Sequence, residues 1–347
     1  MIFFLLIIII IQIIAYMLLN YKNKFNWTIF YIISEDDTSG ISPFFMDLNE
    51  LSKNFNYENI QLCILYTSRH FHGSYEIYSS KNKFIFHPIN INSTLDINII
   101  NKFIEKNQEK YDADKFAIFF GMHCSFWYIS PGEYKNISVS DIRKIFKKKH
   151  YEIIGFDCCY MSTIEVLYEL KDCANYIITC QYSSPSLGLN TNKMITAFDD
   201  NLSTEMICYT IAKSFLERID HAPKIFESAT DVSICCLKYV NDFVNLYKLC
   251  DINYSEKFKE FKIENLDDYP VYDLKNIILS SNITDMMKTK LLLLFDKIII
   301  FYGQSISLSL SLSNKKQNGL SIIFKNLDEI TYGHTYNDLE FSNINTK

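Results

Sequence analysis

Residue types that can carry nucleophilic chemistry follow two apolar runs of the chain. The run IIGFD, at residues 153–157, ends in Asp157 and is followed at once by Cys158 and Cys159. A second apolar run, KFAIFFGMHC, closes on His123. A cysteine becomes a strong nucleophile when it loses its proton, and a nearby histidine together with a helix N-terminus stabilises the thiolate. These residues therefore predict a cysteine nucleophile assisted by a histidine.

The two adjacent cysteines cannot both serve one site. Successive residues of a β-strand face opposite sides of the sheet, so one thiol points to the site and the other to the core. The competing interpretation is that Cys158 and Cys159 are both packing residues, because free cysteine is among the most buried residue types. His123 is likewise open to a structural explanation, as a hydrogen-bonded histidine at a strand end. The spacing alone leaves both interpretations open.

The elements that must position these residues alternate between strands and helices. Apolar runs predict buried strands at residues 27–34, 60–68, 115–124, 151–159 and 175–180, with helices at 44–53, 94–110, 138–149 and 162–171. Residues 75–89 contain a polar turn between two β-rich runs, which predicts a hairpin. Strands that are apolar throughout and alternate with helices are typical of a parallel sheet covered on both faces. Active residues in such sheets gather at the carboxyl ends of the strands, where His123 and Cys159 lie.

The second half of the chain continues the mixed pattern. Helices are expected at residues 203–218 and 284–295, a strand followed by a helix at 228–249, and two late strands at 304–313 and 319–325. The strict alternation of SLSLSLS predicts a half-exposed edge strand. Ser162 and Glu165 have the spacing of a capping box, which predicts the start of the helix that follows the two cysteines.

Composition narrows the class of partner. The chain has 347 residues, 48% of them hydrophobic, and a net charge of −6, which is typical of a folded protein. Nucleic-acid binding requires a concentrated positive surface, and the sequence contains no basic stripe with interleaved aromatic residues. Nucleic acid is therefore excluded as the main partner.

The cysteines do not have the spacing of a metal site. Ten cysteines are present without a single C-x-x-C pair, so no zinc site is predicted and no cofactor is expected. Calcium has no D-x-D-x-D-G loop to bind it, so any calcium site would have to be assembled from distant residues. Reduced thiols of a cytosolic compartment fit this pattern better than a disulfide framework does.

The N-terminus predicts contact with a membrane. Residues 2–19 are apolar apart from Gln12 and Tyr16, a length close to that needed to cross a bilayer. We therefore expect residues 1–20 to form a single-pass membrane anchor; a signal peptide is the alternative. Lys22 and Lys24 follow the span, which favours a cytosolic location for the large domain.

Several longer motifs resemble one known family. HCSFW at residues 123–127, GFDCCYMSTIEVLYELKDCANYIITCQ at 155–181 and GLSIIFK at 319–325 resemble the clostripain-like cysteine peptidases. The similarity runs from about Trp27 to near the C-terminus, so residues 25–347 are expected to form one peptidase domain. The resemblance implies a caspase-like α/β fold with a mostly parallel sheet covered by helices on both faces.

The resemblance also implies roles for individual residues. His123 takes the position of the catalytic histidine, and Cys159 takes that of the nucleophile, with Cys158 where the family has a small buried alanine. Backbone N–H groups of Cys124 and Cys159 would bind the oxyanion. The reaction implied is hydrolysis of a peptide or protein substrate by a Cys-His dyad.

Substrate preference follows from the same resemblance. The family prefers cleavage after Arg or Lys, partly through the acid two residues before the nucleophile, here Asp157. Cys180 and Gln181, at the end of the fifth strand, stand where the family has Ser-Glu and are expected to bind substrate. Asp157 has a second interpretation, as a carboxylate that orders the turn by accepting backbone N–H groups.

Departures from the family pattern keep a second function open. Cys124, Ser125 and Phe126 replace the three glycines after the histidine, and side chains there would obstruct a loop that needs positive φ or close contact with substrate. The two functions expected are a membrane-anchored cysteine endopeptidase and a catalytically impaired peptidase-fold binding protein tethered to a membrane.

Overall fold

The computed structural model describes most of the chain beyond the N-terminal apolar segment. The described residues are 25–35, 42–54, 57–68, 73–80, 83–89, 96–130, 136–146, 149–199, 201–223, 229–263, 270–311, 317–324, 336 and 338–343. The expected membrane anchor at residues 1–20 lies outside them. Within the described residues, no helix has the length and apolar character needed to cross a membrane.

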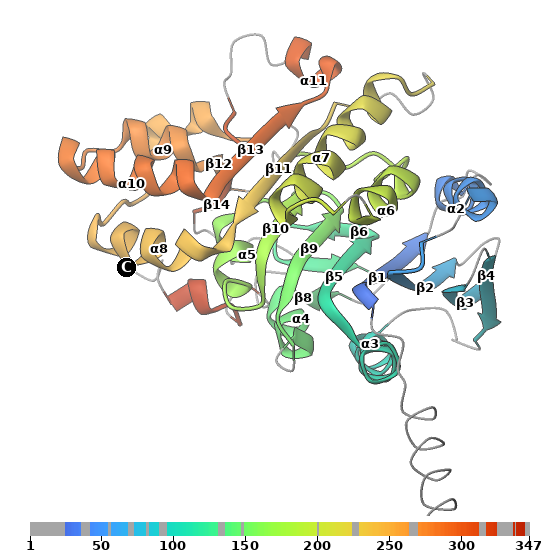
Figure 1. Cartoon of the computed structure of the whole chain (residues 1–347). Helices are drawn as coiled ribbons and strands as arrows, with labels where there is room; N and C mark the ends of the chain where they lie inside the picture. Colours follow the sequence, from blue (N-terminus) through green and yellow to red (C-terminus); the bar gives the residue numbers. More distant parts are fainter. Residues whose placement is uncertain are drawn as a thin grey trace, which may run out of the picture.

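A nine-stranded sheet forms the centre of the fold (Figure 1). Its strands are ordered β13-β11-β10-β9-β5-β1-β2-β3-β4. The five in the middle run parallel: β2 (Ile60–Ser68), β1 (Phe25–Glu35), β5 (Ala113–Gly121), β9 (Tyr151–Asp157) and β10 (Ala174–Thr179). The expected parallel strands are thus confirmed, and all five carboxyl ends lie at one edge of the sheet.

Both flanks of the sheet are antiparallel. β3 (Gly73–Ser80) and β4 (Lys83–Pro88) form the expected hairpin beside β2. On the other flank, β11 (Asp231–Cys236) pairs with β10, and β13 (Ile299–Gln304) pairs with β11. The sheet is therefore parallel at its centre and antiparallel at its edges.

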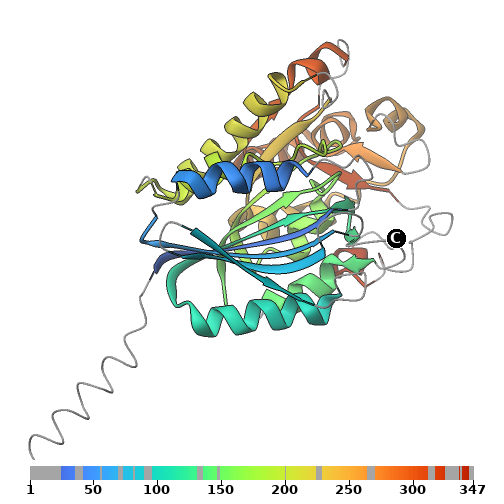
Figure 2. The same cartoon turned by 90° about the vertical axis from the view of Figure 1, so that its right-hand side faces the viewer.

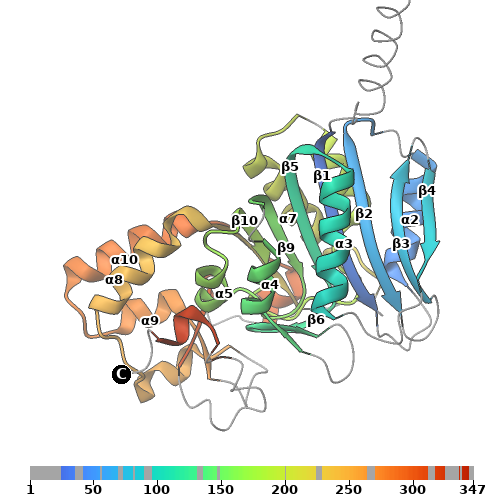
Figure 3. The same cartoon turned by 90° about the horizontal axis from the view of Figure 1, so that it is seen from below.

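Helices cover both faces because the central strands are apolar on both faces. One face carries α2 (Pro43–Asn54), α6 (Thr191–Asp199) and α7 (Thr204–Asp220); the other carries α3 (Ile97–Lys110), α4 (Val139–Ile145), α5 (Ile164–Glu169), α8 (Val240–Leu249), α9 (Leu274–Ser280) and α10 (Asp285–Ile298). Figure 2 shows α2 and α7 above the sheet and α3 below it, and Figure 3 shows α3, α4 and α5 on the face opposite α2. Alternate residues of β1 divide between the two cores: Phe30 and Ile32 pack on one face, Tyr31 and Ile33 on the other.

Two small sheets lie beside the large one. β6 (His123–Ser125), β7 (Tyr128–Ser130) and β8 (Ile137–Ser138) form one, and β12 (Val271–Asp273) with β14 (Ser321–Ile323) forms the other. Short 3-10 turns complete the described elements: η3 (Leu237–Tyr239), η4 (Glu256–Phe261) and η6 (Glu340–Asn343). The expected late strand 319–325 is confirmed as β14, but it lies outside the main sheet.

The SLSLSLS edge strand was wrongly predicted. Residues 306–311 form the helix α11 (Ile306–Ser311) instead. Ser305 provides the reason, because its hydroxyl accepts the amide of Leu308 at 3.3 Å and its carbonyl accepts the amide of Ser309 at 3.0 Å. Such a side-chain contact initiates a helix, in which Leu308 is buried and Leu310 is exposed.

The capping box at Ser162 and Glu165 was also wrongly predicted. Thr163 is the N-cap of α5, its hydroxyl accepting the amide of Val166. Ser162 donates instead to the carbonyl of Gly319 at 2.6 Å, and Glu165 accepts the amide of Ile323 at 2.9 Å. Both side chains are buried between α5 and β14, so tertiary partners take the place of the local ones.

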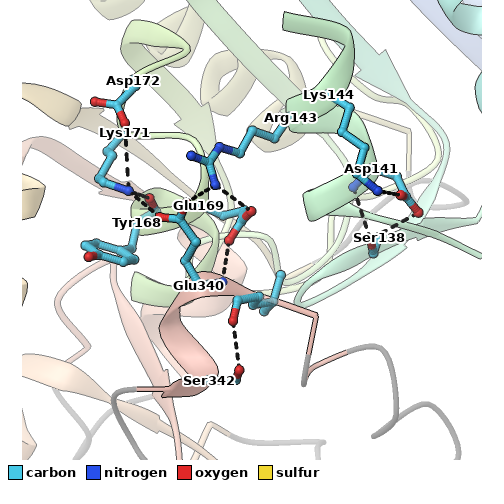
Figure 4. Close-up of polar contacts among 11 residues, drawn as sticks. Ser138, Asp141, Arg143, Lys144, Tyr168, Glu169, Lys171, Asp172, Glu340 and Ser342 are labelled. Carbon is cyan, nitrogen blue, oxygen red and sulfur yellow. Dashed lines mark hydrogen bonds and ion pairs between the residues drawn. The ribbon is translucent and has the colours of Figure 1, made fainter. Parts of the chain in front are cut away.

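A cluster of ion pairs joins the turn η6 to α4 and α5, the helices before and after the two cysteines (Figure 4). The buried Glu169 of α5 accepts Arg143 of α4 at 3.3 Å and the backbone amide of Glu340 at 2.8 Å. Arg143 also pairs with Glu340, and Lys171 reaches Glu340 at 2.7 Å. Partial burial opposes ionisation of Glu340, but these two cations lower its pKa. The contacts join η6, α4 and α5 into one unit.

Glu165 gives a testable dependence of stability on pH. Burial raises its pKa to about 8, against about 4.3 in an unfolded chain. Between these values the folded protein binds more protons than the unfolded protein, so stability falls as pH rises. We expect Glu165→Gln, whose side-chain oxygen still accepts the Ile323 amide, to reduce the loss of Tm between pH 5 and 8.

The matched control is Glu205→Gln on the exposed face of α7. Thermal melts at half-unit pH steps supply the measurement. Asp231, whose pKa burial raises to about 7, accounts for part of the slope that remains. If Tm falls with pH equally steeply in Glu165→Gln and in the unmodified protein, the assignment of a protonated Glu165 is contradicted.

Candidate functional site

A cavity of about 390 Å³ opens at the carboxyl ends of the parallel strands. The ends of β1, β5 and β9 contribute to it, and α2 and the loop after β10 close its sides. His123, Asp157 and Cys159 all line this cavity. The structure therefore brings together three of the residues that the sequence predicts.

His123 is placed by a strand pairing rather than by a loop. Gly121 at the end of β5 is the register partner of Asp157 at the end of β9. His123 follows Gly121 by two residues, as Cys159 follows Asp157. It begins β6, with its side chain exposed, while the preceding Met122 is buried in the core. Parallel pairing thus delivers both reactive side chains to one cavity.

The two cysteines have separate environments. Cys158 is 1% exposed, and its thiol lies 3.1 Å from the carbonyl oxygen of Phe120 within the core. Cys159 lines the cavity, and its sulfur accepts the backbone amide of Ser184 at 3.3 Å. Cys158 is therefore a packing residue, and Cys159 is the thiol available for chemistry.

The environment of Cys159 favours the protonated thiol at neutral pH. Burial raises its pKa to about 11, and the Ser184 amide opposes that shift only in part. The helix expected to follow the two cysteines begins later, because residues 160–162 separate Cys159 from the Thr163 cap of α5. A base must therefore take the proton as the nucleophile attacks.

The backbone amide of Cys124, the residue after His123, lies on the edge strand of a small sheet. β6 and β7 are joined by a two-residue turn, so the flanking pair of Ser125 and Tyr128 exchanges hydrogen bonds and the next pair, Cys124 with Ile129, does not. The Cys124 amide is therefore directed away from β7, on the outer edge of the three-stranded sheet. This direction suits one donor of an oxyanion hole.

The side chain that replaces glycine at residue 124 does not obstruct the cavity. Cys124 is 7% exposed, and its thiol lies 3.7 Å from the carbonyl of Met122, in the core that also holds Cys158. Burial raises the pKa of this thiol well above its usual value, with the contact to Cys158 adding to the shift. The expected obstruction at this position is therefore not observed.

Phe126 adopts the conformation that glycine normally supplies. Its φ is 57°, at the first position of the two-residue turn, where a type II′ hairpin places glycine. Positive φ costs a non-glycine residue about 1–2 kcal/mol. The Phe126 ring is fully buried, with its centroid 5.9 Å from that of Trp127 and 5.6 Å from that of Tyr160. Burial of the ring offsets the strain, so the turn persists without glycine.

Asp157 lies in the wall of the cavity with several donors around it. Its carboxylate accepts the Tyr31 hydroxyl at 2.9 Å, the Leu189 amide at 2.7 Å and the Ser184 hydroxyl at 3.2 Å. Burial raises its pKa, and these donors oppose the shift. Gly188 is required beside it, because its φ is +61° and a Cβ would stand 2.6 Å from the carboxylate.

Cys180 and Gln181 lie behind the cavity rather than in its wall. Cys180 is buried in the core beneath α6 and α7. The Gln181 side chain donates to Asp273 at 3.2 Å and to Ser321 at 3.0 Å. Its carbonyl accepts the amide of Gly319 at 3.1 Å. Both residues thus anchor the start of the loop that closes the cavity.

Sequence reasoning missed the contributions of β1 and α2. Tyr31 and Glu35 reach the cavity from β1, and Asp47 reaches it from α2. The strand-end rule that located His123 also applies to Glu35, because WTIFYIIS ends immediately before it. No signal pointed to Asp47, whose position depends on how α2 packs.

Comparisons with known proteins identify the family. The model of the clostripain family matches residues 31–342. An inactive zymogen C11 protease from Parabacteroides distasonis is 18% identical, with a TM-score of 0.73 over 93% of this chain and 99% of that one. A secreted C11 cysteine protease from Bacteroides thetaiotaomicron, solved with an irreversible peptide inhibitor, is 13% identical, with a TM-score of 0.74 over the same shares. A search of curated proteins found no match.

The expected localisation is corrected by these findings. A single-pass membrane protein was expected, but no described helix could span a bilayer, and the similar protease from Bacteroides thetaiotaomicron is described as secreted. The chemistry of the site needs no cofactor, and across the described ranges no group of three or more His, Cys, Asp or Glu residues is placed to hold a metal ion.

The raised pKa of Cys159 predicts its reactivity. Alkylation by iodoacetamide follows the thiolate fraction, so the rate at Cys159 should still rise about tenfold per pH unit between pH 8 and 10. N-acetylcysteine, the reference thiol, should level off above about pH 8.5–9.5. Mass spectrometry of the Cys159 peptide measures the rate. A plateau near pH 7 would instead demonstrate a preformed thiolate beside His123.

Proposed function

Because the chain belongs to the clostripain family of cysteine peptidases, we propose that it is an endopeptidase in which Cys159 and His123 form the catalytic dyad. The observation that carries the proposal is that both side chains line one cavity at the carboxyl ends of neighbouring parallel strands. The burial of Cys158 supports the choice of Cys159 as the nucleophile. The inhibitor in the similar protease from Bacteroides thetaiotaomicron is a peptide, which supports a peptide substrate.

In acylation, the Cys159 sulfur attacks the substrate carbonyl carbon while His123 takes the thiol proton. A C–S bond forms, and the carbonyl oxygen becomes an anion held by the backbone N–H groups of Cys124 and Cys159. His123 then gives its proton to the leaving amine, the C–N bond breaks, and a thioester remains. The raised pKa of Cys159 suits a proton transfer concerted with attack.

Deacylation returns the enzyme to its starting state. His123 removes a proton from water as the water oxygen attacks the thioester carbonyl. The C–S bond breaks, the carboxylic acid leaves, and Cys159 recovers a proton from His123. Side chains and backbone amides alone supply every step.

The charge of the cavity supports cleavage after Arg or Lys. Among the described residues, three carboxylates line it, those of Glu35, Asp47 and Asp157. The loop at residues 182–190 contains no acid, and the acids come instead from β1, α2 and β9. We assign Asp157 as the residue that receives the basic P1 side chain, because Tyr31, Ser184 and the Leu189 amide hold its carboxylate in place. Cys180 and Gln181 contribute indirectly, by anchoring the cavity loop.

Substitution of the dyad tests the proposal. Cys159→Ala and His123→Ala are expected to lower kcat/KM on a peptide library of varied P1 residues by at least about 10³-fold. Cys158→Ala is the matched control: it removes the neighbouring thiol from the core and is expected to retain cleavage. Loss of activity in Cys158→Ala with activity kept in Cys159→Ala would reverse the assignment.

The same assay addresses the second function. If folded protein cleaves no peptide in the presence of reductant, a catalytically impaired binding protein on the peptidase fold is the remaining function. Its motivation is the replacement of the three glycines after His123, of which Phe126 occupies a position of positive φ.

Asp157→Asn tests the origin of the P1 preference. The amide keeps an oxygen to accept the Leu189 N–H but removes the charge, and a hydrogen bond to a charged group is worth about 1.5–3 kcal/mol. We expect kcat/KM for Arg and Lys at P1 to fall about 10- to 100-fold, with little change for an uncharged P1. Equal losses on all substrates would assign Asp157 a purely structural role.

A further inference from the structure

Of the three carboxylates that the described residues place at the cavity, two accept hydrogen bonds from neutral donors alone and one also pairs with a cation. Glu35 accepts the Tyr66 hydroxyl at 2.7 Å and the Ser42 hydroxyl at 2.9 Å. Asp157 has only hydroxyl and amide donors around it. Asp47 differs, because Arg218 of α7 approaches its Oδ2 at 2.5 Å. Its negative charge is therefore balanced where it meets the cavity.

The ion pair of Asp47 and Arg218 is largely removed from water. The two side chains are 14% and 12% exposed. Solvent and salt screen such charges much less than surface charges. The net charge of the pair therefore influences the electrostatic potential in the neighbouring cavity. Arg218 does not line the cavity itself; its charge acts on the cavity through Asp47, through the chain beside it, and directly on Asp157, whose pKa it lowers against the larger effect of burial.

Arg218 is also linked to Asp157 through one residue. The guanidinium nitrogen that contacts Asp47 donates to the carbonyl of Leu189 at 2.8 Å. The amide of Leu189 donates to Asp157 at 2.7 Å, and Asp47 accepts the amide of Thr191 at 3.1 Å. The ion pair thus fixes the cavity loop at Leu189 and Thr191, from α2 on one side and α7 on the other.

We propose that Arg218 sets the selectivity of the cavity for a cationic side chain by neutralising Asp47, leaving Asp157 and Glu35 as the carboxylates that the substrate meets. Arg218 is a positioning residue and touches no substrate. For its natural ligand, a basic P1 side chain, this inference rests on the proposed function. The inference concerns the charge of the cavity, and this charge can be probed without measuring catalysis.

Two substitutions in the pair shift the charge in opposite directions. Asp47→Asn leaves Arg218 as an unbalanced cation, so preference for a cationic ligand should fall about tenfold. Arg218→Gln leaves Asp47 as an unbalanced carboxylate in the cavity wall, so the preference should rise about threefold or more. The double variant restores neutrality and should return close to the original value, as should Arg218→Lys.

The experiment measures alkylation of Cys159 by two chloroacetamides, one that carries a guanidinium group and one uncharged group of similar size. The ratio of the two rates at Cys159 reports the charge of the cavity. Lys213→Gln is the matched control: it removes a cation from an exposed position of α7, where Lys213 lies 3.9 Å from Glu217, and should change the ratio by less than twofold. In parallel, kcat and KM are measured for peptides with Arg or norleucine at P1.

Opposite changes in the two single variants, cancelled in the double variant, support the proposal. A purely structural pair would lower both rates in both variants and leave their ratio unchanged, which overturns it. Circular dichroism shows which variants fold, and the direction of the change in any folded single variant is sufficient for this decision. If the ratio of alkylation rates changes as expected but the protein cleaves no peptide, the proposed function alone is refuted. If the protein is an active peptidase but the ratio is unaltered in the variants, this inference alone is refuted.

Discussion

The parallel pairing of β5 with β9 is the constraint on which the site depends. Gly121 and Asp157 are partners at the ends of these strands, and His123 and Cys159 each follow by two residues. Adjacent strands lie about 4.8 Å apart. The pairing therefore brings together two chain segments that are 36 positions apart in sequence. The backbone positions of His123 and Cys159 therefore follow from the pairing of these two strands.

That sheet edge must combine an apolar interior with a polar cavity. The thiols of Cys124 and Cys158 lie in the core, whereas the His123 side chain is exposed and the Cys159 sulfur accepts the Ser184 amide at the cavity. Residues adjacent in sequence therefore have different environments just beyond the ends of β5 and β9. The dehydration that raises the pKa of Cys159 and Asp157 follows from this closeness to the core. Donors on the cavity loop offset part of the cost at Asp157, which explains why the loop is fixed by several contacts.

Local sequence patterns predicted the parallel strands, most helices and the position of His123 and Cys159 just beyond two strand ends, because each depends on neighbours along the chain. The strands are apolar throughout, and the reactive residues stand at strand ends. Features that depend on distant partners were not predictable in this way. Glu165 is held by Ile323, Gln181 by Asp273 and Ser321, and Asp47 by Arg218, and in each case the partner is more than 90 residues away. Ser305, which starts a helix where an alternating pattern indicated a strand, shows that one local contact can also override a periodicity.

The arrangement around β5 and β9 also bears on how the chain tolerates a break. The residues between the two strands leave the large sheet and return to it, and the pairing of the strands does not depend on that excursion. The C-terminal turn further joins α4, which precedes β9, to α5, which follows it, through Arg143, Glu169 and Glu340. We therefore expect the site to tolerate a break in the backbone between α4 and β9. Two polypeptides divided in this stretch carry complementary halves of one interface, and their non-covalent reassembly would restore the site.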